Sequence, residues 1–280
     1  MPLRALYIIS DLIYLIMYYL VGYRKKVVFD NLSKAFPEKK EKEILMISKR
    51  FYHYLSDYFI ESIYLINMGI NECNRRYSYK NLGLLQKYYN EGKSIILAIG
   101  HYGNWEWSIN ISICSPYIMY GIYKPLHNKL FDRLFLHIRS KFISVPLPMK
   151  QTLRTLNTLI INKETFALIL LGDQRPPKGD IEFWTQFMNQ ETPVITGMDK
   201  LARKFNLPVI FMNVKRPKRG YYQITFKEIC AEPDKANPYE IAEKYMQSME
   251  SLIKVQPEYW LWSHKRFKYK PEEYKNVAVN

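Results

Sequence analysis

At 280 residues, with 48% hydrophobic and 24% charged residues, the chain is an ordinary globular one that can bury a full core as one large domain or two small ones. Its net charge of +15 favours an acidic partner, but no finger spacing, RNA-binding signature or basic helix followed by heptads supports nucleic acid. The three cysteines lie far apart without a CxxC, which argues against a disulfide framework or a zinc site and fits a reducing compartment.

The first predicted element is an apolar helix over residues 3–21, interrupted by one arginine, one serine and one aspartate. Its length as a helix is about 28 Å, close to the thickness of a bilayer core. Two interpretations stay open: a tilted or interfacial membrane anchor, or an apolar helix that covers the core. We favour the anchor, because the basic residues 24–26 would keep the following body on the cytoplasmic side.

The rest of the chain alternates helical and strand patterns. Periodicity predicts a short helix that ends at Pro37, and further helices over residues 39–67, 81–91, 126–142, 151–162, 192–205 and 238–255. Apolar runs predict strands over residues 95–99, 117–123, 166–171, 207–214 and 221–226. The last two strands would be joined by the basic turn KRPKRG, which is either a contact for acidic lipids or a carrier, or a solvated loop.

No repeat, low-complexity tract or clear linker divides this pattern. The sequence therefore predicts an N-terminal membrane anchor or interfacial helix over residues 1–23 and a single α/β domain over residues 24–280. A mixed central sheet flanked by helices is the expected architecture of that domain.

The stretch from Ile95 to Trp107 carries the chemistry. His101 follows the strand at once, Asn104 is a good helix N-cap, and Glu106 falls in the first helical turn. Across such a turn the Glu106 carboxylate can fold back and hold one imidazole nitrogen, leaving the other free to take a proton from a hydroxyl. About 0.5 accidental His-x4-acid pairs are expected from composition, so the position at a strand end is what favours a site.

A second strand end is also polar. Asp173, Gln174 and Arg175 follow residues 166–171 and lead into a rigid Pro-Pro turn. An aspartate in a turn is usually an Asx-turn, but beside another polar strand end it suggests a site. Lys124 and Arg139 are further candidate cations, with solvated side chains as the alternative, and no metal site is expected.

Six stretches complete the reading: NLSKAFPEKKEKE (31–43), HYGNWEW (101–107), YKPLHNKLFDRL with the later Arg139, LLGDQRPP (170–177), TGMDKLARKFNLPVIF (196–211) and PEYWLWSHKRFK (257–268). Each is weak or moderate alone. In this order, and over nearly the whole chain, they resemble the late-acylating lipid A acyltransferases of Gram-negative bacteria, the lauroyl and myristoyl transferases.

This resemblance implies a glycerolphosphate-acyltransferase-like fold and an activity without a cofactor. The acyl donor would be acyl-carrier protein or acyl-CoA, and the acceptor a hydroxyl of a phosphorylated glycolipid. The enzyme would act on the cytoplasmic side of the inner membrane, where carrier, lipid and anionic leaflet are all acidic.

The resemblance also assigns residues. The family's His-x4-acid motif maps to His101 and Glu106, and its Asp-Gln element maps to Asp173-Gln174. Its Tyr-Arg-Pro element maps to Tyr123-Lys124-Pro125, where lysine removes the bidentate geometry of arginine. Backbone N–H groups near Asn104, or a cation among Lys124, Arg139 and Arg175, would stabilise the oxyanion.

Two other functions compete with lipid A acylation. The same chemistry could act on another acceptor, such as an aminolipid, a mannosylated phosphoinositide or a pigment precursor. Alternatively, the chain could be a non-catalytic membrane protein that binds acidic lipids, which would leave the polar strand ends unexplained. No GxSxG motif is present, so a serine hydrolase of that type is not supported.

Overall fold

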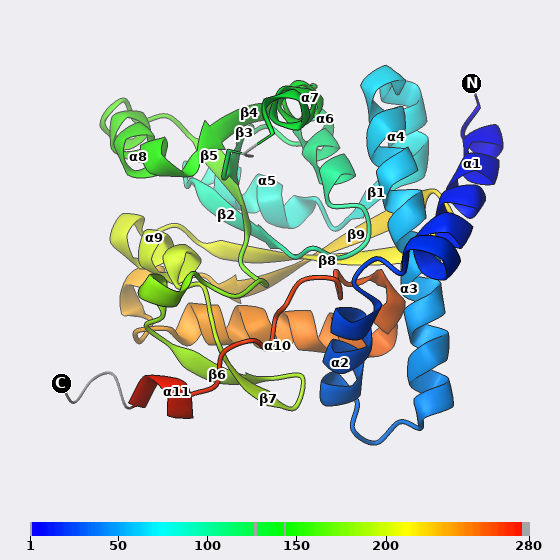
Figure 1. Ribbon diagram of the computed structural model, residues 1–280. Coiled ribbons are helices and arrows are strands. Elements are labelled where there is room, and N and C mark those ends of the chain that lie inside the picture. The colour runs from blue at the N-terminus through cyan, green and yellow to red at the C-terminus, as the bar shows by residue number, and fades with distance from the viewer. Residues whose placement is uncertain (1, 126–127, 143, 276–280) are drawn as a thin grey trace.

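The computed structural model describes residues 2–125, 128–142 and 144–275, and its centre is a seven-stranded sheet (Figure 1). The strands are β1 (Tyr77–Lys80), β2 (Ile95–Ile99), β3 (Ile118–Tyr123), β4 (Ser144–Pro148), β5 (Phe166–Leu171), β8 (Val209–Lys218) and β9 (Tyr221–Cys230). Their order is β1-β9-β8-β2-β5-β3-β4, and every neighbouring pair is parallel except the β8–β9 hairpin.

Helices surround this sheet, with α10 packed on β8 and β9 and with α1 and α2 packed on α3. The helices are α1 (Leu3–Leu15), α2 (Lys25–Ala35), α3 (Glu41–Tyr64), α4 (Ile70–Arg76), α5 (Gly83–Asn90), α6 (Ile111–Cys114), α7 (Lys129–Arg139), α8 (Thr152–Ile161), α9 (Gly197–Phe205), α10 (Glu240–Val255) and α11 (Glu272–Lys275). The predicted mixed α/β fold with an N-terminal apolar helix is confirmed. Residues 126–127 of one predicted helix and 276–280 of the predicted domain lie outside the described residues.

One predicted helix begins too early. Residues 190–193 do not open the helix expected over 192–205, because they form strand β7 (Gln190–Pro193), antiparallel to β6 (Trp184–Phe187). The Thr192 side chain accepts a hydrogen bond from the buried Arg266, which holds this segment extended. The Thr-Pro pair resembles a helix start, but its hydrogen-bond partners lie elsewhere in the chain.

Two edge strands were not predicted, and both have weak patterns. β1 has four residues, and β4 contains two prolines, which cannot donate to a ladder and are confined to edges and bulges. By contrast, all five residues of β2 are buried between β5 and β8, which explains its uninterrupted apolar run.

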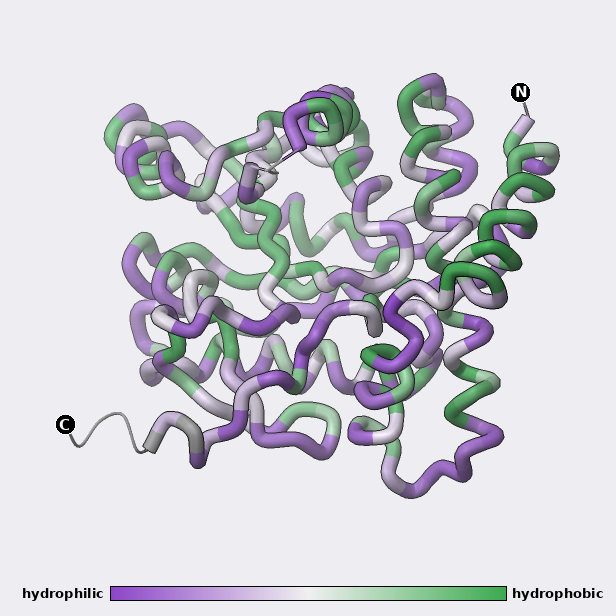
Figure 2. Tube along the Cα trace, viewed as in Figure 1, coloured by the Kyte–Doolittle hydropathy of each residue, from purple (hydrophilic) through white to green (hydrophobic). Residues whose placement is uncertain are grey.

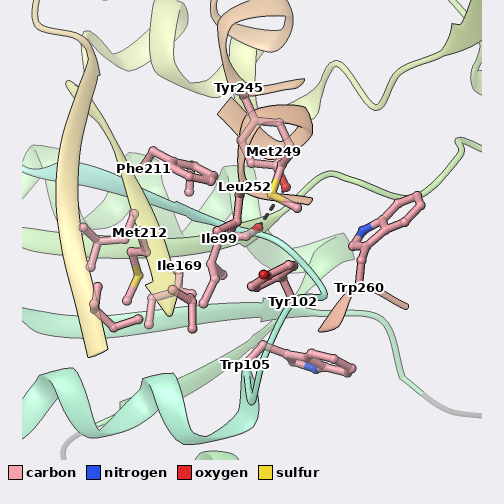
Figure 3. Close-up of a cluster of buried hydrophobic side chains, with 14 of the residues drawn as sticks. Ile99, Tyr102, Trp105, Ile169, Phe211, Met212, Tyr245, Met249, Leu252 and Trp260 are labelled. Carbon is pink, nitrogen blue, oxygen red and sulfur yellow. Dashed lines mark hydrogen bonds between the residues drawn. The ribbon is translucent and has the colours of Figure 1, made fainter. Parts of the chain in front are cut away.

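The carboxyl ends of β2 and β5 are joined by one buried tyrosine of α10. The Tyr245 hydroxyl donates to the Ile99 carbonyl at 2.9 Å and accepts from the Gly172 amide at 3.2 Å. Ile99, Tyr245 and Met249 belong to the apolar cluster beneath this edge (Figure 3). The bridge fixes the two chain segments that leave the sheet here.

The N-terminal apolar segment continues α1 through a π-helical turn, Ile16–Val21. Over Leu3–Val21 its mean hydropathy is 1.5, so by length and composition alone it could cross a membrane (Figure 2). Its polar residues face α3, where the Tyr7 hydroxyl donates to Glu61 and the Ser10 hydroxyl donates to Asp57, both at 2.7 Å. Tyr7 and Ser10 therefore hold the helix against the domain, and of the residues that interrupt the apolar run Ser10 has this role.

The basic turn predicted after β8 is only partly a turn. The strands extend to Lys218 and Tyr221, and Arg216 points inward to donate to Asp57 at 2.7 Å. Burial alone would raise the pKa of Asp57, but hydrogen bonds from Arg219 and the charge of Arg216 hold it below its ordinary value. This buried ionic network joins α1, α3 and the β8–β9 hairpin.

Removal of Arg216 should therefore be costly. In Arg216→Ala, the buried carboxylates Asp57 and Glu61 lose a counter-charge, and we expect the free energy of unfolding to fall by about 3 kcal/mol. Urea denaturation at pH 7 measures this change. The matched control is Lys215→Ala, an exposed neighbour on the same strand, which should cost about 0.5 kcal/mol or less. Equal losses in the two variants would contradict the stabilising role of the network.

Candidate active site

The two polar strand ends meet at one edge of the sheet. β2 and β5 are parallel, and their register pairs Ile99 with Leu171, so the residues that follow both strands are neighbours. His101 Nδ1 lies 2.8 Å from Asp173 Oδ1, and the His101 amide donates to Asp173 Oδ2 at 3.0 Å. The predicted juxtaposition of these strand ends is thus present.

Asp173 determines which imidazole nitrogen is free. Burial alone would raise the pKa of this carboxyl, but the charge of His101 and hydrogen bonds from His101 and Trp260 hold it below its ordinary value. An ionised carboxylate can only accept, so Nδ1 of His101 carries the hydrogen. In the neutral form of the imidazole the lone pair is then on Nε2, and the side chain retains 22% exposure. This arrangement gives an oriented, reachable base.

The expected contact between Glu106 and the imidazole is wrong. The Glu106 carboxylate instead accepts two hydrogen bonds from Arg139 of α7, Nε–Oε2 at 2.9 Å and Nη2–Oε1 at 2.6 Å. Across the described residues, no hydrogen bond joins Glu106 to His101. The reason is the path of the chain: Tyr102 pairs with Trp260 and Gly103 has φ +59°, so the residues between do not fold the carboxylate back.

The pair of Glu106 and Arg139 is linked to the histidine through aromatic side chains, since the Tyr58 hydroxyl donates to Glu106 Oε1 at 3.5 Å. Burial alone would lower the pKa of Arg139, but its hydrogen bonds to Glu106 raise it. The neighbouring Trp105 ring packs edge-on to the imidazole with centroids 5.1 Å apart, and it stacks on Tyr58 at 4.0 Å. The ion pair therefore supports the packing around His101 rather than its hydrogen bond.

Asn104 has the capping contact predicted for it. Its Oδ1 accepts from the Trp107 amide at 3.2 Å, but the segment that follows, Glu106–Asn110, is a 3₁₀-helix before α6 begins. Its Nδ2 donates to Glu61 at 2.8 Å, and the side chain is fully buried. Asn104 thus joins the histidine segment to the ionic network under α1.

Three other candidates are not hydrogen-bonded to the histidine in the described part of the chain. Tyr123 ends β3, Lys124 is exposed, and Gln174 is partly buried. In the described ranges, none of their side chains makes a hydrogen bond to His101. The structure therefore groups His101 with Asp173, and Glu106 with Arg139.

Sequence reasoning missed the contribution of the C-terminal tail. The Trp260 indole donates to Asp173 Oδ2 at 2.7 Å, and Arg266 Nε donates to the Asp173 carbonyl at 2.9 Å. In the structure Trp260 and Trp262 of this tail are buried in the core. Its mixture of tryptophans and cations was the only signal that pointed to this role.

Several buried donors near Asp173 lack acceptors among the described residues. These are Arg175 Nε and Arg266 Nη2, and His264 Nδ1 is a further unpaired atom. Burial, with the charges of Arg175 and Arg266, lowers the pKa of His264 to about 4, so this imidazole is neutral at pH 7. Buried donors without acceptors are suited to an anionic group.

One cluster has metal-ligating residue types. Single ligand atoms of Asp11, His53 and Asp57 lie within 4.8 Å of one another. Arg219 already donates to both aspartates, and Arg216 donates to Asp57. The guanidinium groups occupy the carboxylate oxygens, so this cluster does not fit a cation.

The model of the bacterial lipid A biosynthesis acyltransferase family matches residues 1–269. No curated protein sequence matches the chain. The matched range includes both polar strand ends, the α7 arginine and the tail that contacts Asp173.

The low pKa of His264 predicts acid sensitivity. Between pH 6.5 and about 4 this histidine is protonated in the unfolded chain but not in the folded chain. The free energy of unfolding therefore decreases as the pH is lowered through that window, by up to about 3 kcal/mol. Urea denaturation at pH 7 and pH 4.5 should show a smaller loss for His264→Gln than for the unsubstituted protein. The exposed His137 provides the control, since His137→Gln should lose as much as the unsubstituted protein.

Proposed function

The chain belongs to the bacterial lipid A biosynthesis acyltransferase family, and we propose that it moves a fatty acyl chain from a thioester donor to a hydroxyl of a lipid A precursor. The observation that carries the mechanism is the 2.8 Å contact between His101 Nδ1 and the buried Asp173. This contact supports Asp173, rather than Glu106, as the carboxylate that orients the proposed base.

The proposed reaction needs no enzyme nucleophile, because a thioester is already activated. His101 Nε2 removes the proton of the acceptor hydroxyl as its oxygen attacks the thioester carbonyl carbon. The tetrahedral intermediate then collapses to the ester and expels the thiolate. The thiolate receives from the imidazolium the proton that came from the acceptor hydroxyl. Asp173 stabilises the imidazolium through Nδ1, as a carboxylate does in a serine-hydrolase triad.

The oxyanion of that intermediate needs hydrogen-bond donors. Arg175 Nε and Arg266 Nη2 are the best candidates, since both are buried and lack acceptors in the described part of the chain. Arg139 is less suited, because two of its donors are engaged by Glu106. We assign the pair of Glu106 and Arg139 to positioning Trp105 beside the imidazole.

The net charge of the chain supports the proposed donor and location. Acyl-carrier protein and acyl-CoA are both anionic, as are phosphorylated glycolipids and the inner leaflet, and the chain carries +15. We propose that α1 associates with the inner membrane and that Arg24, Lys25 and Lys26 keep the domain on its cytoplasmic side.

The catalytic assignment is tested by three variants. His101→Ala should lose about 10²–10⁴-fold in kcat, and Asp173→Asn a similar factor, since an amide cannot stabilise the imidazolium as a carboxylate does. Glu106→Gln should also lose activity, because Arg139 loses its counter-charge. The measurement that separates them is the pH–rate profile: its acid limb moves to lower pH in Asp173→Asn and stays in place in Glu106→Gln. If the acid limb moved in Glu106→Gln and stayed in place in Asp173→Asn, Glu106 rather than Asp173 would be the carboxylate that orients His101.

The acceptor is tested by mass spectrometry of total lipids from a strain that lacks the gene, beside its parent. Loss of one acyl chain from lipid A is the expected result, and the mass difference identifies the chain. If lipid A is unchanged and another lipid class disappears, the chemistry stands and the acceptor assignment is wrong. If no acylated lipid changes, even after related genes are removed, the non-catalytic lipid-binding function is favoured instead.

A further inference from the structure

A hollow of about 300 Å³ lies where α1 and α4 meet the turn between β8 and β9. Its lining residues are Arg4, Tyr7, Arg76, Lys218, Arg219 and Tyr221. Four of these six side chains are cations and none is acidic. None of them takes part in the proposed acyl transfer, so this hollow needs an explanation of its own.

Two of the cations are held rigidly. Arg219 donates to Asp57 and Asp11, and Arg76 Nη1 donates to the Gly220 carbonyl at 3.2 Å. Gly220 has φ +74°, and a Cβ there would collide with the Tyr7 hydroxyl, so only glycine lets the turn pack this closely. The wall of the hollow is therefore preorganised by contacts that run into the core.

The other two cations are uncompensated. Arg4 and Lys218 are exposed, and in the described ranges no ion pair joins either side chain to a carboxylate. The Lys218 ammonium lies 4.1 Å from the Tyr221 ring centroid, which keeps it beside the hollow. An adjoining hollow of about 350 Å³ shares Arg4, Arg76 and Tyr221, and it is also lined by Glu72, which pairs with Arg76. Clustered guanidinium and ammonium groups of this kind match a phosphate group.

The surface beside the hollow indicates which phosphate is bound. The outer face of α1 and its π-helical extension is apolar and open to solvent, with Ile8 at 72% exposure, Leu12 at 56% and Leu20 at 80% (Figure 2). A phospholipid supplies both a charged head and apolar chains, whereas a free phosphate ion would leave this face uncovered.

We propose that this hollow, lined by Arg4, Arg76, Lys218 and Arg219, binds the phosphate of an anionic phospholipid headgroup while the outer face of α1 contacts the acyl chains. The site gives α1 a second means of attachment to the membrane besides its apolar face. Headgroup binding at this end fixes the orientation of the helix relative to the bilayer surface, because α1 is already joined to the domain through Asp57 and Glu61.

Co-sedimentation of the full chain with vesicles tests the proposal. Vesicles of phosphatidylcholine alone are compared with vesicles that also contain phosphatidylglycerol. The double variant Arg4→Ala/Lys218→Ala should bind the phosphatidylglycerol vesicles about 20-fold more weakly and the neutral vesicles almost unchanged. The control, Arg154→Ala/Lys227→Ala, removes the same charge from exposed positions of α8 and β9, and it should stay within about twofold of the unsubstituted protein.

Equal losses in the two double variants would mean diffuse attraction by net charge and would overturn the proposal. If the double variant does not fold, Lys218→Ala alone, with an expected loss of about fivefold, decides the question. A thermal-shift series with short-chain phosphatidylglycerol or with inorganic phosphate identifies the source of the phosphate. An equal stabilisation by inorganic phosphate, lost in Arg4→Ala/Lys218→Ala, would overturn the lipid assignment. His101→Ala should bind vesicles normally, so this result is independent of the proposed catalysis.

Discussion

Asp173 is a fully buried carboxylate, and a buried charge must be satisfied at both oxygens. Its oxygens accept from the His101 ring, the His101 amide and the Trp260 indole, and its carbonyl accepts from Arg266. These donors come from the end of β2 and from the C-terminal tail. Compensation of one charge therefore closes the tail over the edge of the sheet and orients the imidazole, so stability and proposed catalysis depend on the same hydrogen bonds.

A second buried carboxylate, Glu61 of α3, likewise collects hydrogen bonds from several elements, on the other side of the histidine segment. It accepts from Tyr7 of α1, Tyr222 of β9 and Asn104 beyond His101. The segment that carries the proposed base, His101, is thus held at one end by Asp173 and at the other by Glu61. Because Tyr7 shares Glu61 with Asn104, the position of α1 is coupled to that of the histidine segment through two hydrogen bonds.

Local patterns predicted most helices and strands, because the apolar run of a buried strand such as β2 and the periodic apolar positions of a helix such as α3 both lie within one continuous segment. Partner choice was harder. The spacing of His101 and Glu106 suggested a local pair, whereas the imidazole pairs with a residue 72 positions away. That contact depends on the register of β2 against β5, and no pattern in one sequence records a register between distant strands. The hydrogen bond from Trp260 to Asp173 could not be predicted either, because it also joins residues that are distant in the sequence.

The basic run at the end of β8 shows how strand geometry divides charge between the core and the surface. Successive side chains of a strand point to opposite faces, so Arg216 shares the buried face with Val214, while Lys215 is exposed. The register shift between Lys215 and Lys218 interrupts this alternation, and Lys218 is exposed as well. Arg216 and Arg219 are then used to neutralise buried carboxylates, and Lys218 remains available to an external anion. The count of 41 lysines and arginines consequently overstates the free cations, because some of these residues balance acids inside the fold. The acidic partners that such a composition suggests must be sought where cations remain unpaired, as they do beside the N-terminal helix.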